Sequence, residues 1–114
     1  MKIHLKYSDF GETYSCKGEL IKKESIFEGE GIDSGLGNVV LKAKFYDEKT
    51  KNKLLVFLNE DEGFIFIGNK NEEKKYPGKI YSPIKKINIE DKFEEIEETL
   101  KEESSEEAFL KIID

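Results

Sequence analysis

The sequence predicts an α+β fold: one domain of 114 residues, in which an antiparallel β-sheet of about five to seven strands carries one or two C-terminal helices. Apolar and polar residues alternate through much of residues 1–89, as they do in half-buried strands. From residue 93 onwards the apolar residues recur every three or four positions, which is helical spacing. Short turns separate the predicted strands, so we expect a meander, with curling into a barrel as an open alternative.

Charge changes at the same place as periodicity. The formal net charge of the chain is −6. Residues 90–114 contain 11 acids and 3 lysines, which leaves 14 acids and 16 lysines for residues 1–89. The single domain, residues 1–114, therefore consists of a near-neutral β-rich part (1–89) followed by an acidic helical part (90–114).

The first strands are predicted near the N-terminus. Residues 2–7 alternate strictly, with Ile3, Leu5 and Tyr7 on one face. Tyr14 and Cys16 continue the pattern more weakly. Residues 19–28 are compatible with two short strands or with one bent strand.

The middle of the chain contains the clearest strands. Residues 39–46 alternate, whereas residues 53–59 are apolar on both faces, which is typical of a central strand. The acidic turn 60–63 ends in glycine and leads into residues 64–67, so we expect three consecutive antiparallel strands. Residues 79–89 are predicted to add a strand, with Pro83 placing it at an edge or a bend.

The C-terminal part favours helix. Asn88 or Asp91 is expected to cap a helix that carries Phe93, Ile96 and Leu100 as a narrow apolar stripe. A break is expected at residues 104–105, and a second short helix after it. A closing strand over residues 108–113 is the alternative.

Composition excludes several kinds of site. One cysteine and one histidine exclude an internal disulfide and a four-ligand Cys/His zinc site, and we expect no metal and no cofactor. The chain has no apolar run near the roughly 20 residues of a membrane helix. Its N-terminus lacks a signal-peptide core. We therefore expect a cytoplasmic protein without membrane contact.

Residues of catalytic type are few, so we do not expect an enzyme. His4 lies on the polar side of the first predicted strand, and Cys16 is expected to be a buried small apolar residue. Lysine clusters are mostly interleaved with acids, which makes nucleic-acid binding unexpected. A basic strip remains open only if Lys42 and Lys44 converge with the hairpin at residues 48–52.

The glycine-rich stretch at residues 28–38 is unusual. We expect a mobile connection or a β-bulge there. A partner-binding loop, with Glu30 and Asp33 as secondary contacts, and a weak ion site are the alternatives.

The acidic C-terminal part supplies the main functional hypothesis, beside the simpler interpretation of a solvated helix face. Concentrated negative charge would steer the chain onto a protein with a basic surface. A small acidic domain of this kind is typical of stoichiometric inhibitors, such as phage anti-defence and toxin-immunity proteins. A small-ligand carrier with an apolar barrel cavity is the alternative function. The predicted partner-binding residues are Glu94, Glu95, Glu97, Glu98, Glu102 and Glu103.

Overall fold

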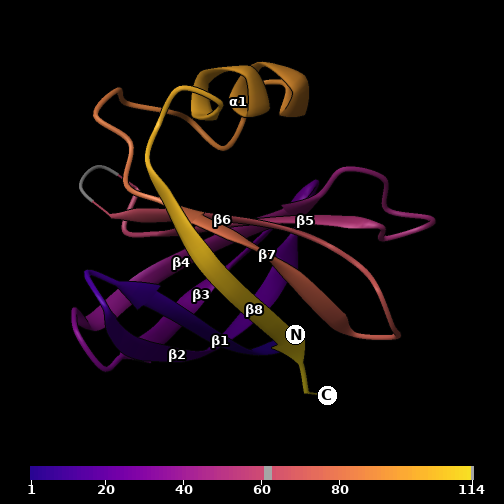
Figure 1. The fold of residues 1–114 in the computed structure, drawn as a ribbon. Helices are drawn as coiled ribbons and strands as arrows, with labels where there is room; N and C mark the ends of the chain where they lie inside the picture. The colour runs from indigo at the N-terminus through magenta and orange to yellow at the C-terminus, as the bar shows by residue number, and fades with distance from the viewer. Residues whose placement is uncertain (61–62, 114) are drawn as a thin grey trace.

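The computed structural model describes residues 1–60 and 63–113, and these form a closed antiparallel β-barrel with one short helix (Figure 1). Each strand pairs with the next along the chain, and the last strand pairs with the first. The strands are β1 (Lys2–Asp9), β2 (Glu12–Lys23), β3 (Ile26–Asp33), β4 (Gly37–Phe45), β5 (Lys53–Leu58), β6 (Phe64–Asn69), β7 (Lys75–Tyr81) and β8 (Ser105–Ile112).

The barrel corrects the predicted number of strands, which is eight and not five to seven. The antiparallel meander is otherwise as predicted, although helix makes up less of the fold than an α+β class implies. The acidic turn of the predicted β5–β6 hairpin includes residues 61–62, which lie outside the described residues. Its two strands pair as expected, with Leu58 opposite Phe64.

The barrel interior is an apolar core made from every second residue of the strands. On β1, for instance, Ile3 and Leu5 are fully buried, whereas Lys2 and Lys6 are exposed. The buried residues of this core are Ile3, Leu5, Tyr7, Cys16, Leu20, Val39, Leu41, Ala43, Phe45, Leu54, Val56, Leu58, Phe66, Tyr76, Ile80, Ala108 and Leu110.

A second core lies outside the barrel, between β5–β6 and the segment that joins β7 to β8. This segment contains the helix α1 (Phe93–Leu100), which lies over β5 and β6 in Figure 1. Leu55 and Phe57 point outward from β5 into this core, which explains why residues 53–59 are apolar on both faces. The buried residues of the second core are Leu55, Phe57, Ile65, Ile87, Ile89, Phe93, Ile96 and Leu100.

Two predictions about residues 79–100, one on a strand and one on the helix cap, are wrong in detail. The N-cap of α1 is Lys92, which makes no capping hydrogen bond through its side chain. Asp91 instead accepts a hydrogen bond from the backbone N–H of Asn88 (3.3 Å) within the preceding turn. Residues 79–89 also differ, because β7 ends at Tyr81, before Pro83, and Ile87 and Ile89 pack in the second core without forming a strand.

The predicted second helix is also wrong, and its alternative, a closing strand, is present as β8. Ala108 and Leu110 are buried inside the barrel, whereas Glu107 and Lys111 are exposed, so this segment follows period two. Without β8, the edges of β1 and β7 would have unpaired backbone groups. Closing the sheet therefore outweighs the helical pattern of a short segment.

The glycine-rich stretch is not a mobile loop. β3 runs through it and pairs with β2 on one side and β4 on the other. Residues 19–28 are thus two strands joined by a tight turn. Gly29 lies so close to β2 that an added Cβ would clash with the carbonyl of Glu19. Glycine permits this close approach of the two backbones.

Candidate functional site

The acidic side of the molecule is held rigidly by the packing of α1. Phe93, Ile96 and Leu100 are buried against the barrel, so the opposite side of the helix faces solvent. We call four exposed carboxylates the acidic cap: Glu94, Glu95 and Glu98 of α1, and Glu102 in the turn that follows it.

The other two predicted contact residues are half-buried. Glu97 forms an ion pair with Lys53 of β5 (3.0 Å), which ties the helix to the barrel. The same ammonium group lies 5.5 Å from the ring centre of Tyr46 and 5.8 Å from that of Phe93. Glu103 continues the turn after α1, where its N–H donates to the carbonyl of Leu100. The structure therefore brings four of the six predicted carboxylates together on the open surface.

Glu94 is stabilised in its charged form. Hydrogen bonding to its own backbone N–H and to the hydroxyl of Tyr46 lowers the pKa of the Glu94 carboxyl. Tyr46 is 52% exposed beside this carboxylate, with its ring edge-on to Phe93. The acidic cap therefore has an aromatic side chain at its border.

Lysines near the acidic cap are already engaged. Lys101 pairs with Glu98 (3.0 Å), and Lys44 donates to the carbonyl of Asp91 (2.6 Å). Lys42 pairs with Glu60 (3.1 Å). Lys42 and Lys44 therefore do not form the basic strip that the sequence left open.

The two predicted secondary contacts, Glu30 and Asp33, differ in their exposure to solvent. Glu30 is exposed on the outside of β3. Asp33 is buried, with 1% of its surface exposed. It accepts a hydrogen bond from the hydroxyl of Tyr7 (2.7 Å) and others from the N–H groups of Gly35 and Leu36. Asp33 fixes the turn after β3 through these hydrogen bonds, and its burial leaves Glu30 as the accessible one of the two predicted contacts.

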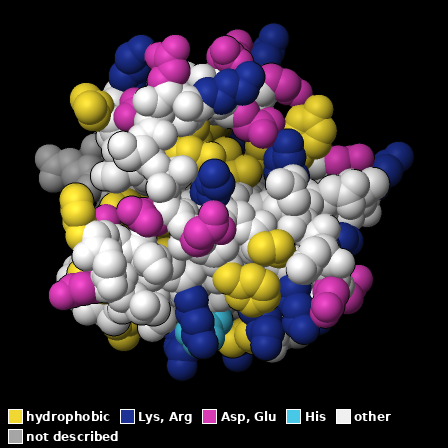
Figure 2. All heavy atoms as spheres, viewed as in Figure 1, with side chains coloured by type: hydrophobic (Ala, Val, Ile, Leu, Met, Phe, Trp, Pro, Cys, Tyr) yellow, Lys and Arg dark blue, Asp and Glu magenta, His cyan; other side chains and the backbone are white. Residues whose placement is uncertain are grey.

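A basic surface that the sequence analysis missed lies on the other side of the barrel. Outward side chains of β8, β1 and β2 form it, and in Figure 2 lysines surround the single histidine at the foot of the molecule. Lys111 of β8 lies opposite His4, which in turn lies opposite Lys17 of β2. We call this surface the basic face: Lys2, His4, Lys6, Lys17 and Lys111. Only strand register reveals it, because these residues are far apart in sequence.

Of the four lysines in the basic face, Lys2 lies opposite Glu19 of β2, and the other three have no ion pair among the described residues. Partial burial lowers the pKa of His4, and the positive charges of Lys17, Lys6 and Lys111 lower it further. Lys111 also lies directly opposite Lys75 of β7, and like charges in such positions destabilise a sheet. Lys6, Lys17 and Lys111 therefore keep positive charges that no ion pair of the described residues offsets.

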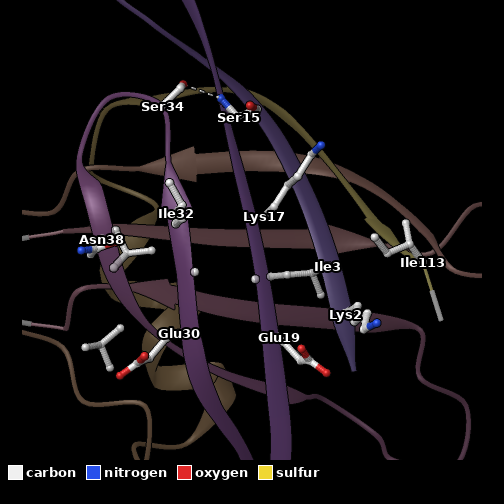
Figure 3. A pocket seen from close by; sticks show the side chains of 14 residues that line it. Lys2, Ile3, Ser15, Lys17, Glu19, Glu30, Ile32, Ser34, Asn38 and Ile113 are labelled. Atoms are coloured by element: carbon white, nitrogen blue, oxygen red, sulfur yellow. Dashed lines mark hydrogen bonds between the residues drawn. The ribbon is translucent and has the colours of Figure 1, made fainter.

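A shallow hollow adjoins the basic face on the outside of β2, β3 and β4 (Figure 3). Lys17 borders it from β2, and the N–H of Ser15 donates to the hydroxyl of Ser34 at one end (3.0 Å). Ile32 and Ile113, which are 67% and 52% exposed, line its sides. The basic face therefore has exposed aliphatic neighbours.

The residues of catalytic type do not converge. His4 points out of the barrel, whereas Cys16 is fully buried inside it, so the two lie on opposite faces of the sheet. Burial raises the pKa of the Cys16 thiol to about 12. Among the described residues, no three His, Cys, Asp or Glu side chains lie close enough to hold a metal ion.

Large side chains occupy the barrel interior. Tyr76, Phe66 and Leu5 are among the largest fully buried residues, and the Tyr76 hydroxyl donates to the carbonyl of Lys51 (2.7 Å). Eight strands enclose a space just wide enough for such a filling. This packing argues against the carrier hypothesis.

Comparison of the chain with protein-family models, with curated proteins and with solved structures gives no match. No helix in residues 1–60 and 63–113 combines the length and the apolar character needed to cross a bilayer.

Proposed function

We propose that this chain is a non-enzymatic protein-binding module whose acidic cap docks on a basic surface of another protein. The observation that carries the proposal is the packing of α1, which buries Phe93, Ile96 and Leu100 and leaves the acidic cap exposed on a fixed support. A preformed charged surface loses little conformational entropy on binding. Its field also accelerates encounter with a surface of opposite charge.

An inhibitor of the anti-defence or immunity type is the form of this function that we favour. Such a protein acts by covering a basic surface, and it needs no reacting groups of its own. The acidic cap supplies the charge for rapid association. Tyr46, at the border of the cap, supplies an aromatic side chain of the kind that prolongs residence.

Affinity capture from the native host, followed by binding measurements on the purified captured protein, tests the proposal. The cap variant carries Glu95→Gln, Glu98→Gln and Glu102→Gln. The matched control carries Glu24→Gln, Glu48→Gln and Glu73→Gln, which are exposed acids outside the cap. Both variants lose three negative charges, so any difference between them reports position.

We expect the cap variant to bind at least about tenfold more weakly than the wild type, with the control unchanged. The affinity of the wild type is expected to fall between about 50 and 500 mM NaCl, because salt screens exposed charges. Equal binding by all three chains, or binding that ignores salt, contradicts the proposal.

A further inference from the structure

We propose that the acidic cap of one copy of this chain docks on the basic face of a second copy, so that copies associate head-to-tail. The inference rests on the proposed function, because it names a partner for the acidic cap. It also accounts for the basic face, which that function leaves unused.

The two surfaces of one chain are complementary in charge. Residues 90–103 contain eight acids and two lysines, whereas the basic face contains four lysines, with Glu19 beside Lys2 and Lys17 at its edge. In Figure 2 the lysine cluster lies at the foot of the molecule, away from the helix at the top. A second copy can therefore offer a basic face to the acidic cap of the first copy, and an acidic cap to its basic face.

Three of the four lysines of the basic face, which lie near one another, lack carboxylate partners among the described residues. Lys111, His4 and Lys17 form a row across three strands, with neighbours about 5 Å apart. Elsewhere in the described chain many lysines are paired with carboxylates, as Lys53 is with Glu97. Lys111 also lies opposite Lys75 of β7, and carboxylates from outside would relieve this repulsion. The acidic cap supplies Glu94, Glu95 and Glu102, which form no ion pair among the described residues.

The positions of the two surfaces on the barrel favour an open, head-to-tail assembly over a closed dimer. β1 and β5 are four places apart in a ring of eight strands, so they lie on opposite sides of the barrel. The acidic cap is mounted over β5 and β6, and β1 is the centre of the basic face. In a two-fold dimer each cap would have to contact the other copy's basic face within one interface, which surfaces on opposite sides of the barrel cannot do. When one cap binds one face, a cap and a face therefore stay open at the two ends, and further copies can bind there.

Apolar side chains adjoin both surfaces. Tyr46 is half exposed at the border of the acidic cap, and Ile32 and Ile113 are exposed beside the basic face. Such contacts add apolar burial to an association that charge alone would leave weak.

Two variants with neutral substitutions test the proposal. The cap variant is the one described above, and the face variant carries Lys6→Gln, Lys17→Gln and Lys111→Gln. Analytical ultracentrifugation at about 20 mM NaCl would follow the mass of each chain over increasing concentration. We expect the wild type to exceed its monomer mass of 13.2 kDa progressively and to return to monomer at about 500 mM NaCl.

Mixing the variants gives the decisive result. Each variant alone lacks one of the two surfaces and is expected to be a monomer. The cap variant retains the basic face and the face variant retains the acidic cap, so an equimolar mixture should form one interface and stop at a dimer. The control Glu24→Gln, Glu48→Gln and Glu73→Gln should assemble like the wild type.

Three outcomes overturn the inference. The first is a wild type that remains a monomer at low salt at every concentration. The second is a mixture of variants that forms no dimer. The third is a monomeric chain whose basic face binds a labelled oligothymidylate of about 20 nucleotides, with binding lost in the face variant. A monomeric wild type whose acidic cap still binds a captured host protein would overturn this inference and leave the proposed function standing.

Discussion

The two sides of the barrel differ in how the chain uses their outer surface. Over β5 and β6 the outward residues are apolar and the chain covers them itself with α1, whereas the outer face of β8, β1 and β2 is basic and bare. Lysines also behave differently: Lys53 is paired on the covered side, and Lys17 is unpaired on the bare side within the described residues. The covered side contributes stability, and the bare side is available for a partner.

The largest loss of stability is expected from a substitution in the second core. Ile96→Ala should lower the free energy of unfolding by about 2–5 kcal/mol, because Ile96 is buried between α1 and the barrel. Ile84→Ala is the matched control, since Ile84 is 93% exposed on the same connecting segment. Urea denaturation followed by circular dichroism measures both. Equal losses would mean that α1 is not anchored as described.

A smaller loss is expected at Asp33. Asp33→Asn removes one acceptor from a buried group that receives three hydrogen bonds, which should cost about 1–3 kcal/mol. Asp47→Asn tests the same change at an exposed turn, where the carboxylate accepts from the N–H of Lys49. Urea denaturation should show little change for Asp47→Asn, and a comparable loss there would contradict a structural role particular to Asp33.

Substitutions of lysine should have opposite signs on the two sides. Lys111→Gln removes a like charge directly opposite Lys75 of β7 and should raise the free energy of unfolding by about 0.2–1 kcal/mol. Lys53→Gln removes an ion pair and should lower it by up to about 1 kcal/mol. Both are measured at low salt, where charge effects are largest. The same sign for both would remove the contrast between the two sides.

The smallest effect concerns pH. His4 faces Lys17 from β2 and Lys111 from β8, with Lys2 and Lys6 on its own strand, and its folded pKa lies below 6.5. The unfolded chain therefore binds a proton in a window below pH 6.5 in which the folded chain does not. The contribution of His4 to stability is lost as pH falls through this window.

His4 is the only histidine, so its imidazole signal in NMR gives its pKa directly. We expect Lys17→Gln to raise that pKa and His4→Gln to reduce the slope of stability with pH in the window just below pH 6.5. A pKa at or above 6.5 in the wild type would contradict a positive potential at this face.

The sequence predicted an element correctly where the spacing of apolar residues within that element was enough to identify it. The apolar residues on both faces of residues 53–59 correctly indicated a strand buried on two sides, although the second side is a helix and not another sheet. The stripe of Phe93, Ile96 and Leu100 correctly placed a helix there. In the following segment, eight residues from Ser105 were too few to distinguish period two from helical spacing, and pairing with β1 and β7 decided their structure.

Candidate site residues close together in sequence were predictable, whereas those brought together only by strand pairing were not. Glutamates near one another in sequence were predicted as a group, and four of them form the acidic cap. The basic face escaped prediction because Lys6, Lys17 and Lys111 meet only through the register of three strands. The burial of Asp33 was not predicted because its neighbouring glycines resemble a loop, whereas its hydrogen bonds to Tyr7 and the following turn bury it.

Paramagnetic relaxation between copies tests most directly whether the acidic cap and the basic face meet. A nitroxide on Lys92→Cys lies at the start of α1 beside the acidic cap and removes no ion pair seen among the described residues, and buried Cys16, with a pKa of about 12, resists labelling. At low salt, mixed with a ¹⁵N-labelled wild-type chain, it should broaden the amide signals of His4, Lys17 and Lys111 and leave those of β5 and β6 sharp. No broadening, or broadening centred on another part of the barrel, would contradict the account.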